Sequence, residues 1–175
     1  KCGIMDQYSV ALGLKDYALL LDCAALRHKY IPMELGDYRL LIMDSKKPRS
    51  LIHSKYNERK AQCEEALRQI QAATHDVQHL ADADMHWLDV LSDEVIHKRA
   101  RHVITENLRV KEAAKVLQVN DLSTFGRLMN ASHASLKNDY EVTGIEMDTL
   151  AETARQVKGC LGARMTGAGF GGCAI

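Results

Sequence analysis

The chain has 175 residues, of which 46% are hydrophobic and 26% charged, and its 23 basic side chains are balanced by 23 acidic ones. This composition is typical of a soluble globular protein, and the length suffices for one hydrophobic core without disulfides or metals. Zero formal net charge argues against a nucleic-acid partner and against a polybasic membrane surface. No apolar run approaches the roughly 18 residues of a transmembrane helix, so we expect no membrane association.

The five cysteines are odd in number, far apart and without a C-x-x-C pair. This usage is typical of reduced thiols in a cytoplasmic protein. The first residue is Lys1, and the residues after it resemble neither a signal peptide nor a flexible tail. We therefore expect the sequence to be a piece of a longer one.

The first third of the chain contains two short apolar runs, Tyr17–Cys23 and Tyr38–Asp44, separated by a segment with Pro32 and Gly36. Their length and flanking residues predict strands buried on both faces, although periodicity alone allows buried helix. From Ser54 onward apolar residues recur among charged ones, which predicts an amphipathic helix with Ser54 as its N-cap.

The middle of the chain changes character twice. Residues 74–86 are rich in His and Asp and predict a loop or a weakly held helix. From Ser92 the apolar positions recur at three- and four-residue steps. This spacing predicts one long helix, with a break allowed near Asn107.

Two more helices and a glycine-rich turn are predicted for the last third. Asp121 caps one helix, and the next runs from about Gly144 to Lys158–Gly159, where glycine supplies a left-handed end. Residues 162–175 predict a glycine-rich turn between short strands. The order strand, strand, helices, strand favours an α+β fold over alternating βαβ units.

The glycine run 167–172 satisfies the pattern G-x-G-x-x-G, which is a weak signal by itself. A dinucleotide site needs a further helix and strand after the run, but only three residues follow it, so we reject that interpretation. Consecutive glycines permit positive φ and let an anion approach backbone N–H groups. A phosphate-binding loop and a plain hairpin both stay open, and the neighbouring Arg164 and Thr166 favour the anion.

Asp6 is a second candidate, because its carboxylate lies between Gly3 and an apolar stretch. If apolar packing partly desolvates it, Asp6 can act as a general base or bind a sugar hydroxyl. The alternative is an aspartate that caps a short helix.

The histidines and the basic residues suggest neither a metal site nor a nucleic-acid site. His75 and His79 have helical i, i+4 spacing, but two ligands are too few for a metal site, so we expect a solvated polar face. His102 and His133 fall on predicted helices, where we expect surface or satisfied interhelical residues. The basic residues of Lys98–Arg101 are offset by Asp93 and Glu94 and predict an ordinary helix face.

Five segments of the sequence resemble segments that follow one another in the same order in galactokinases. They are Cys2–Tyr8, Ser54–Arg59, Arg99–Asn107, Ser132–Leu136 with Asp139–Val142, and Met165–Cys173. The chain therefore resembles the galactokinases of the GHMP kinase superfamily, which also includes homoserine, mevalonate and phosphomevalonate kinases. One small departure is Tyr8, where phenylalanine is common.

The resemblance implies a C-terminal fragment, because a complete galactokinase is more than twice as long. The missing N-terminal half would carry the sugar-binding segment, the serine-rich phosphate loop and the residues associated with magnesium. The implied fold is α+β, with residues 1–45 at the edge of the N-terminal domain. Residues 46–175 would form the C-terminal domain, with helices packed on a mostly antiparallel sheet.

The resemblance also implies roles for particular residues. Asp6 matches the catalytic aspartate, which takes the proton from the C1 hydroxyl of galactose or holds that hydroxyl for attack. Gly3 and Tyr56 match positions near the bound sugar. Thr166, Gly167, Ala168 and Gly169 match a loop that supports the nucleotide phosphates. No metal ligand is assigned, and the ligands of Mg²⁺ are expected outside the chain.

The implied reaction is transfer of the γ-phosphoryl group of ATP to galactose, giving galactose 1-phosphate in the cytoplasm. We expect the isolated fragment to be inactive, because its partner half is missing. Two alternatives stay open: a galactokinase-like sensor that binds sugar and nucleotide without turnover, and an N-acetylgalactosamine kinase. The sequence indicates no oligomeric state.

Overall fold

The computed structural model of the chain describes residues 3–47 and 52–175, with side chains from residue 55 onward in the second range. The elements in chain order are α1 (Met5–Leu12), β1 (Tyr17–Asp22), β2 (Arg27–Pro32), β3 (Met43–Asp44), α2 (Ile52–Ala73), η1 (Leu80–Asp82), η2 (Met85–Val90), α3 (Glu94–Gln118), α4 (Leu122–Ser135), η3 (Leu136–Tyr140), α5 (Ile145–Gln156) and β4 (Cys173–Ala174). Elements η1 and η2 are 3₁₀ helices, and η3 is a π-helical turn that continues α4.

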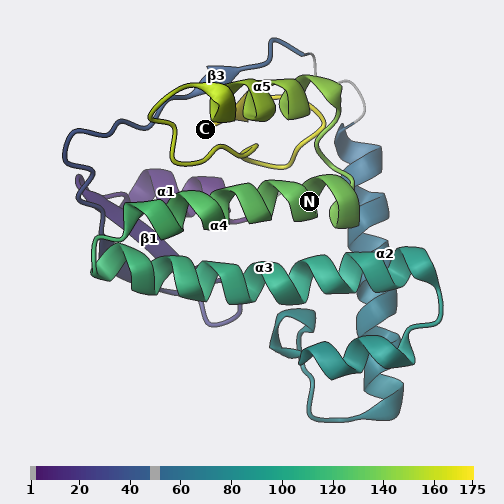
Figure 1. Ribbon diagram of the computed structural model, residues 1–175. Coiled ribbons are helices and arrows are strands. Elements are labelled where there is room, and N and C mark those ends of the chain that lie inside the picture. The colour runs from purple at the N-terminus through teal and green to yellow at the C-terminus, as the bar shows by residue number, and fades with distance from the viewer. Residues whose placement is uncertain (1–2, 48–51) are drawn as a thin grey trace.

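Helices α3 and α4 lie side by side and run in opposite directions, and they form the centre of the molecule (Figure 1). Helix α2 crosses the end of this pair, and a lower core fills the space between α2, α3 and the two 3₁₀ helices, with Ile70 and Ile104 fully buried. Helix α5 and the C-terminal segment lie on the other side of α4. A second core there contains Met147 and Met165, both fully buried.

Two small antiparallel sheets complete the fold. Strands β1 and β2 form a hairpin in the register Tyr17↔Pro32. Strand β3 pairs with β4, and Met165 forms a further antiparallel bridge to Ala174 on the other side of β4. The glycine-rich segment is therefore the tip of a hairpin, and the predicted α+β class is confirmed.

Two predicted helix starts are confirmed by cap geometry, whereas the helix end predicted at Lys158–Gly159 is wrong, because α5 ends at Gln156 with Val157 as its C-cap. Asp93 and Asp121 accept hydrogen bonds from Ile96 N and Thr124 N at 2.9 Å, so both begin helices as N-caps. Helix α3 runs unbroken past Asn107. The predicted N-cap Ser54 is wrong, because α2 already begins at Ile52.

The predicted strand Tyr38–Asp44 is wrong over most of its length. Only its last two residues, Met43 and Asp44, pair with another strand. Leu41 and Ile42 are 68% and 71% exposed, so apolar composition alone did not make a buried strand. Strand β2, which the sequence did not suggest, exists because it completes the hairpin with β1. Strand β1 itself is only half-buried, not covered on both faces.

No helix within residues 3–47 and 52–175 is both long and apolar enough to cross a membrane. The proposed boundary between residues 45 and 46 stays a prediction. Ser45 N donates to Gly172 O at 2.9 Å, so the end of the first predicted segment is joined to the C-terminal hairpin.

Candidate functional site

Two of the predicted sugar-site residues lie together in space. A Cβ built on Gly3 would lie 4.0 Å from Tyr56 Oη, so the start of the chain meets the first turns of α2. Asp6 lies nearby in sequence, in the first turn of α1, and its side chain is exposed. The alternative that Asp6 caps this helix is wrong, because the N-cap position is Ile4. The described residues also leave the carboxylate in solvent and do not desolvate it.

Helix α1 is held on the β1–β2 hairpin by tyrosines. Tyr8 Oη lies 2.9 Å from His28 Nδ1 and donates to Leu26 O at 3.3 Å, so the hydroxyl at this unusual position has partners. Tyr30 Oη donates to Leu12 O at 2.8 Å at the other end of the helix. These polar contacts fix the orientation of α1 although none of its residues is buried.

The glycine-rich segment forms a tight hairpin with a left-handed backbone. Gly167 and Gly169 have φ values of +80° and +83°, which strain any residue with a Cβ. Gly167 and Ala168 are exposed at the tip, whereas Gly169 is buried. Among the described residues, the N–H groups of Gly167, Ala168 and Gly169 have no hydrogen-bond partner. Within the part of the chain that the structure describes, the hairpin therefore presents unpaired backbone donors at the exposed Gly167 and Ala168, as an anion site requires.

Arg164 does not take part in this tip. Its Nη1 lies 3.5 Å from Glu106 Oε1 of α3, and its Nε donates to Met165 O at 3.0 Å. The expectation that Arg164 favours an anion at the glycine run is therefore not supported by its position. Thr166 is half-buried, and its N–H is used in the hairpin, donating to Cys173 O at 2.9 Å.

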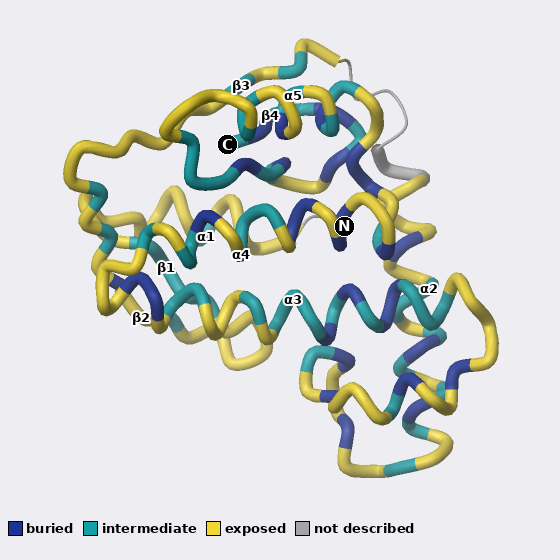
Figure 2. Tube along the Cα trace, viewed as in Figure 1, coloured by how far each residue is buried: buried dark blue, intermediate teal, exposed yellow. Residues whose placement is uncertain are grey.

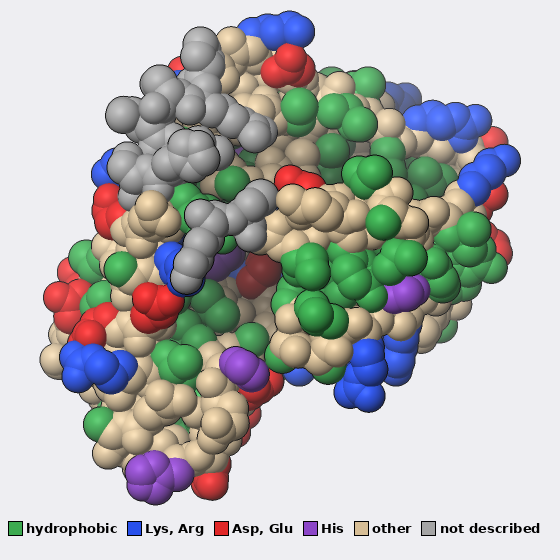
Figure 3. All heavy atoms as spheres, turned by 180° about the vertical axis from the view of Figure 1, so that it is seen from behind, with side chains coloured by type: hydrophobic (Ala, Val, Ile, Leu, Met, Phe, Trp, Pro, Cys, Tyr) green, Lys and Arg blue, Asp and Glu red, His purple; other side chains and the backbone are tan. Residues whose placement is uncertain are grey.

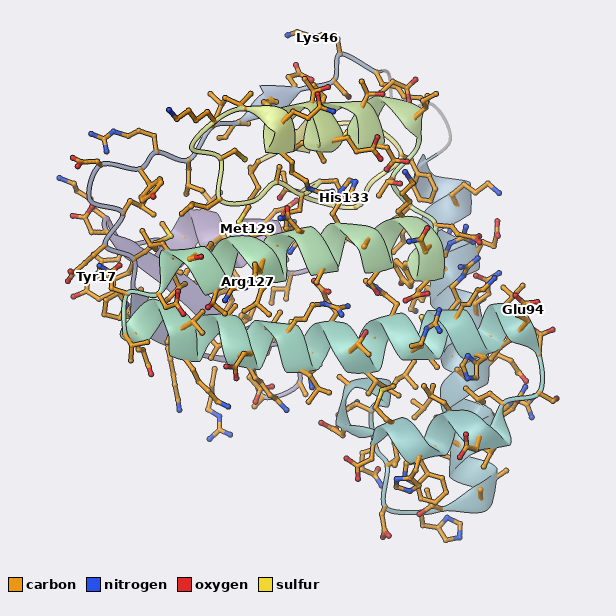
Figure 4. The ribbon with its side chains drawn as sticks, viewed as in Figure 1. Tyr17, Lys46, Glu94, Arg127, Met129 and His133 are labelled. Carbon is orange, nitrogen blue, oxygen red and sulfur yellow. The ribbon has the colours of Figure 1, made fainter. Side chains whose placement is uncertain are left out.

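His133 fixes the base of the hairpin from α4 (Figure 4). Its Nδ1 accepts a hydrogen bond from Met165 N at 3.1 Å, so its proton is on Nε2, which lies 3.2 Å from Asp148 Oδ1. Burial lowers the pKa of His133, which keeps the ring in this neutral form. Both His133 and His102 are buried between helices and not on the surface, and His102 Nδ1 lies 2.9 Å from Ser135 Oγ. His133 is satisfied only at Nδ1, because the geometry between its Nε2 and Asp148 does not form a hydrogen bond among the described residues.

Two arginines near the site were not recognised in the sequence. Arg59 and Arg99 have side chains that are only 7% and 3% exposed. The basic run at residues 98–101 therefore does not form an ordinary solvated helix face, since Arg99 points inward. Their positions in the sequence could have revealed them, because both arginines fall on the apolar side of their helices. A charged side chain is stable there only when it has hydrogen-bond or ion-pair partners.

The predicted residues form two groups. Gly3 lies beside Tyr56 of α2 and Asp6 follows in the first turn of α1, whereas residues 166–169 form the hairpin tip. Among the described residues, no hydrogen bond joins the two groups. No cluster of three His, Cys, Asp or Glu side chains that could hold a metal occurs in the described ranges.

A cleft of about 980 Å³ lies elsewhere, between the β1–β2 hairpin and the η1–α3 region. Apolar walls from Leu20 and Val110 and basic side chains such as Arg27 and Lys111 line it. It contains none of the predicted site residues, so it is separate from the candidate site.

Comparison with known proteins shows what the chain is similar to. Residues 111–175 match the family described as GHMP kinases C terminal. The chain is 57% identical to galactokinase of Staphylococcus carnosus over 99% of its length and 54% identical to galactokinase of Levilactobacillus brevis. It spans about 45% and 46% of the length of these curated relatives.

A solved structure, that of Lactococcus lactis galactokinase complexed with galactose, is 51% identical and superposes with a TM-score of 0.95. The match covers 100% of this chain and 46% of that one. Residues 111–175 therefore match a GHMP kinase C-terminal region, and the chain is similar over at least 99% of its length to slightly less than half of a galactokinase.

Proposed function

We propose that this chain is the C-terminal part of a galactokinase, which transfers the γ-phosphoryl group of ATP to the C1 hydroxyl of galactose. The observation that carries the proposal is the 57% identity to a galactokinase over 99% of the chain. Galactose, present in the related Lactococcus lactis structure, and ATP are the proposed substrates. The free thiols of the described cysteines support a cytoplasmic location.

The proposed chemistry depends on positioning. Asp6 takes the proton from the C1 hydroxyl or orients it for in-line attack, and its exposure leaves room for a substrate. Tyr56, beside Gly3, donates a hydrogen bond to a ring hydroxyl of the sugar. Residues Thr166–Gly169 support the nucleotide phosphates, and the N–H groups of Gly167 and Ala168, which are unpaired among the described residues, are suitable donors. Mg²⁺, held by ligands outside these residues, supplies charge neutralisation when bound.

The remaining part of the site is proposed to come from an N-terminal segment like that of the relatives. Val10 on α1 is 88% exposed, and the residues 36–42 are exposed throughout (Figure 2). Figure 3 shows hydrophobic side chains gathered in a band over the face on which α1 lies. An apolar surface of this kind indicates that another protein segment covers it. Because that segment would carry the phosphate loop, we expect the 175 residues alone to be inactive.

A chimera tests the proposal. The part of Lactococcus lactis galactokinase that the chain does not match is joined to these 175 residues, and galactose-dependent ADP release is measured. We expect turnover from the chimera and none from the 175 residues alone. Absence of turnover from a folded chimera that binds ATP would refute the proposed activity.

Asp6→Asn in the chimera tests the catalytic assignment. Loss of the carboxylate removes the base but preserves the shape, so we expect kcat to fall by about a hundredfold or more, within the range of general-base contributions. Asp16→Asn, an exposed aspartate in the turn after α1, is the control. An unchanged kcat in Asp6→Asn would refute the catalytic role of Asp6.

Two alternatives remain distinct outcomes. A chimera that binds galactose and ATP without turnover, although Asp6 and the hairpin are intact, would indicate a sensor. Faster turnover of N-acetylgalactosamine than of galactose would indicate an N-acetylgalactosamine kinase.

A further inference from the structure

Three consecutive backbone carbonyls at the end of η3 are bound by two buried arginines. Arg99 Nη1 donates to Asp139 O at 2.5 Å, and Arg59 donates to Tyr140 O at 2.6 Å and to Glu141 O at 3.2 Å. The chain reverses here through Glu141, which has a left-handed φ of +54°. Carbonyls at a helix end lack partners within the helix, and cations are favoured there.

The two guanidinium groups also share a hydrogen-bond acceptor, and Arg99 pairs with a carboxylate. Gln62 Oε1 accepts from Arg99 Nε at 2.9 Å and from Arg59 Nη1 at 3.2 Å. Arg99 Nη2 donates to Glu141 Oε2 at 2.7 Å. Buried cations persist only where their donors are satisfied, and this planar geometry suits arginine rather than lysine.

The next carbonyl of the same turn holds the glycine-rich hairpin. Val142 O accepts from Phe170 N at 2.8 Å, and a Cβ on Gly169 would lie 2.2 Å from the same oxygen. Residues 139–142, here named the arginine-bound turn, therefore contact α2 and α3 on one side and the hairpin on the other. Tyr56 lies three residues before Arg59 on α2, and this spacing places both residues on one face of the helix.

We propose that Arg59 and Arg99 are positioning residues of the kinase. They fix the arginine-bound turn, and the turn fixes the hairpin tip relative to Tyr56, although neither arginine is expected to touch substrate. This inference rests on the proposed function for its catalytic consequence, because the rate of phosphoryl transfer depends on how accurately the phosphate-binding and sugar-binding groups are placed. The structural coupling itself does not depend on that function.

Amide hydrogen exchange of the 175-residue chain tests the coupling without reference to activity. In Arg59→Lys and Arg99→Lys we expect the Phe170 amide to exchange at least about tenfold faster, because a lysine replaces only one bond of each fork. The amide of Ile70 in the lower core should be unchanged. Arg68→Lys, which alters an exposed pair with Glu65 on the same helix, is the matched control.

Two results would overturn the coupling. Either the Phe170 amide stays as protected as in the wild type, or Phe170 and Ile70 accelerate equally, which would show global destabilisation. If a lysine variant does not fold, Glu141→Ala removes the side-chain partner of Arg99 Nη2 at a half-exposed position and gives the same test.

Kinetics of the chimera test the catalytic consequence. We expect Arg99→Lys to lower kcat about tenfold and Arg68→Lys to leave it within twofold. Arg99 and Gly169 both act through the arginine-bound turn, so the effects of their substitutions should not multiply. We expect the kcat of the double variant Arg99→Lys/Gly169→Ala to lie within about threefold of the kcat of the slower single variant. Multiplied effects, or an unchanged kcat in Arg99→Lys, would overturn the positioning role. A chimera without turnover refutes the proposed function instead, and hydrogen exchange then decides the coupling alone.

Discussion

Gly169→Ala separates the two reasons for a glycine at the hairpin tip. The residue has a φ of +83°, which costs roughly 1–2 kcal/mol once a Cβ is present. The new Cβ would also lie 2.2 Å from Val142 O, whereas ordinary contacts are 3.4–4 Å, so hairpin and turn must separate by about 1.2 Å. This separation breaks the 2.8 Å bond from Phe170 N to Val142 O, at a cost of about 1 kcal/mol, and loosens the packing of Val142.

The expected loss of stability is therefore about 3 kcal/mol, or about 9 °C in Tm for a chain of this size. Gly159→Ala is the control, because Gly159 has a φ of +93° but nothing within 4 Å of its Cβ position. The stability of that variant should fall only by the cost of the strained backbone, about 1.5 kcal/mol. Urea unfolding at 25 °C, followed by circular dichroism, measures both. The reasoning fails if Gly169→Ala is no more destabilised than Gly159→Ala.

Three further predictions concern other parts of the molecule. Burial lowers the pKa of His102 to about 4, so the unfolded chain binds more protons between pH 4 and 6.5 and stability should rise with pH across this window, by up to about 3 kcal/mol. His102→Gln should flatten that part of the pH profile of urea unfolding, and an equal slope in both proteins would contradict the assignment. Asp121→Ala removes the cap of α4 and should cost about 1 kcal/mol in thermal unfolding, against less than about 0.5 for the exposed Glu112→Ala. Tyr56→Phe in the chimera should raise KM for galactose several-fold with a smaller change in kcat; an unchanged KM would remove Tyr56 from the sugar site.

The sequence by itself determined the helical part of the fold. Asp93 and Asp121 mark helix starts through short-range hydrogen bonds to backbone N–H groups three residues later, which depend on local sequence only. The same holds for the glycine-rich turn, where Gly167, Gly169, Gly171 and Gly172 have φ values between +80° and +125°, a region that glycine adopts without a steric penalty. The ordered segments shared with galactokinases indicated the family, because they extend over the whole chain.

Only the tertiary structure decided which of the apolar and charged residues are buried. Leu41 and Ile42 look like a core strand but are exposed, because a strand needs a partner and only Met43 and Asp44 have one. Arg99 looks like part of a solvated basic face but is buried, because the carbonyl of Asp139, forty residues later, accepts its hydrogen bond. Partners so distant in sequence leave no periodic signal, and burial of a charge depends on them entirely.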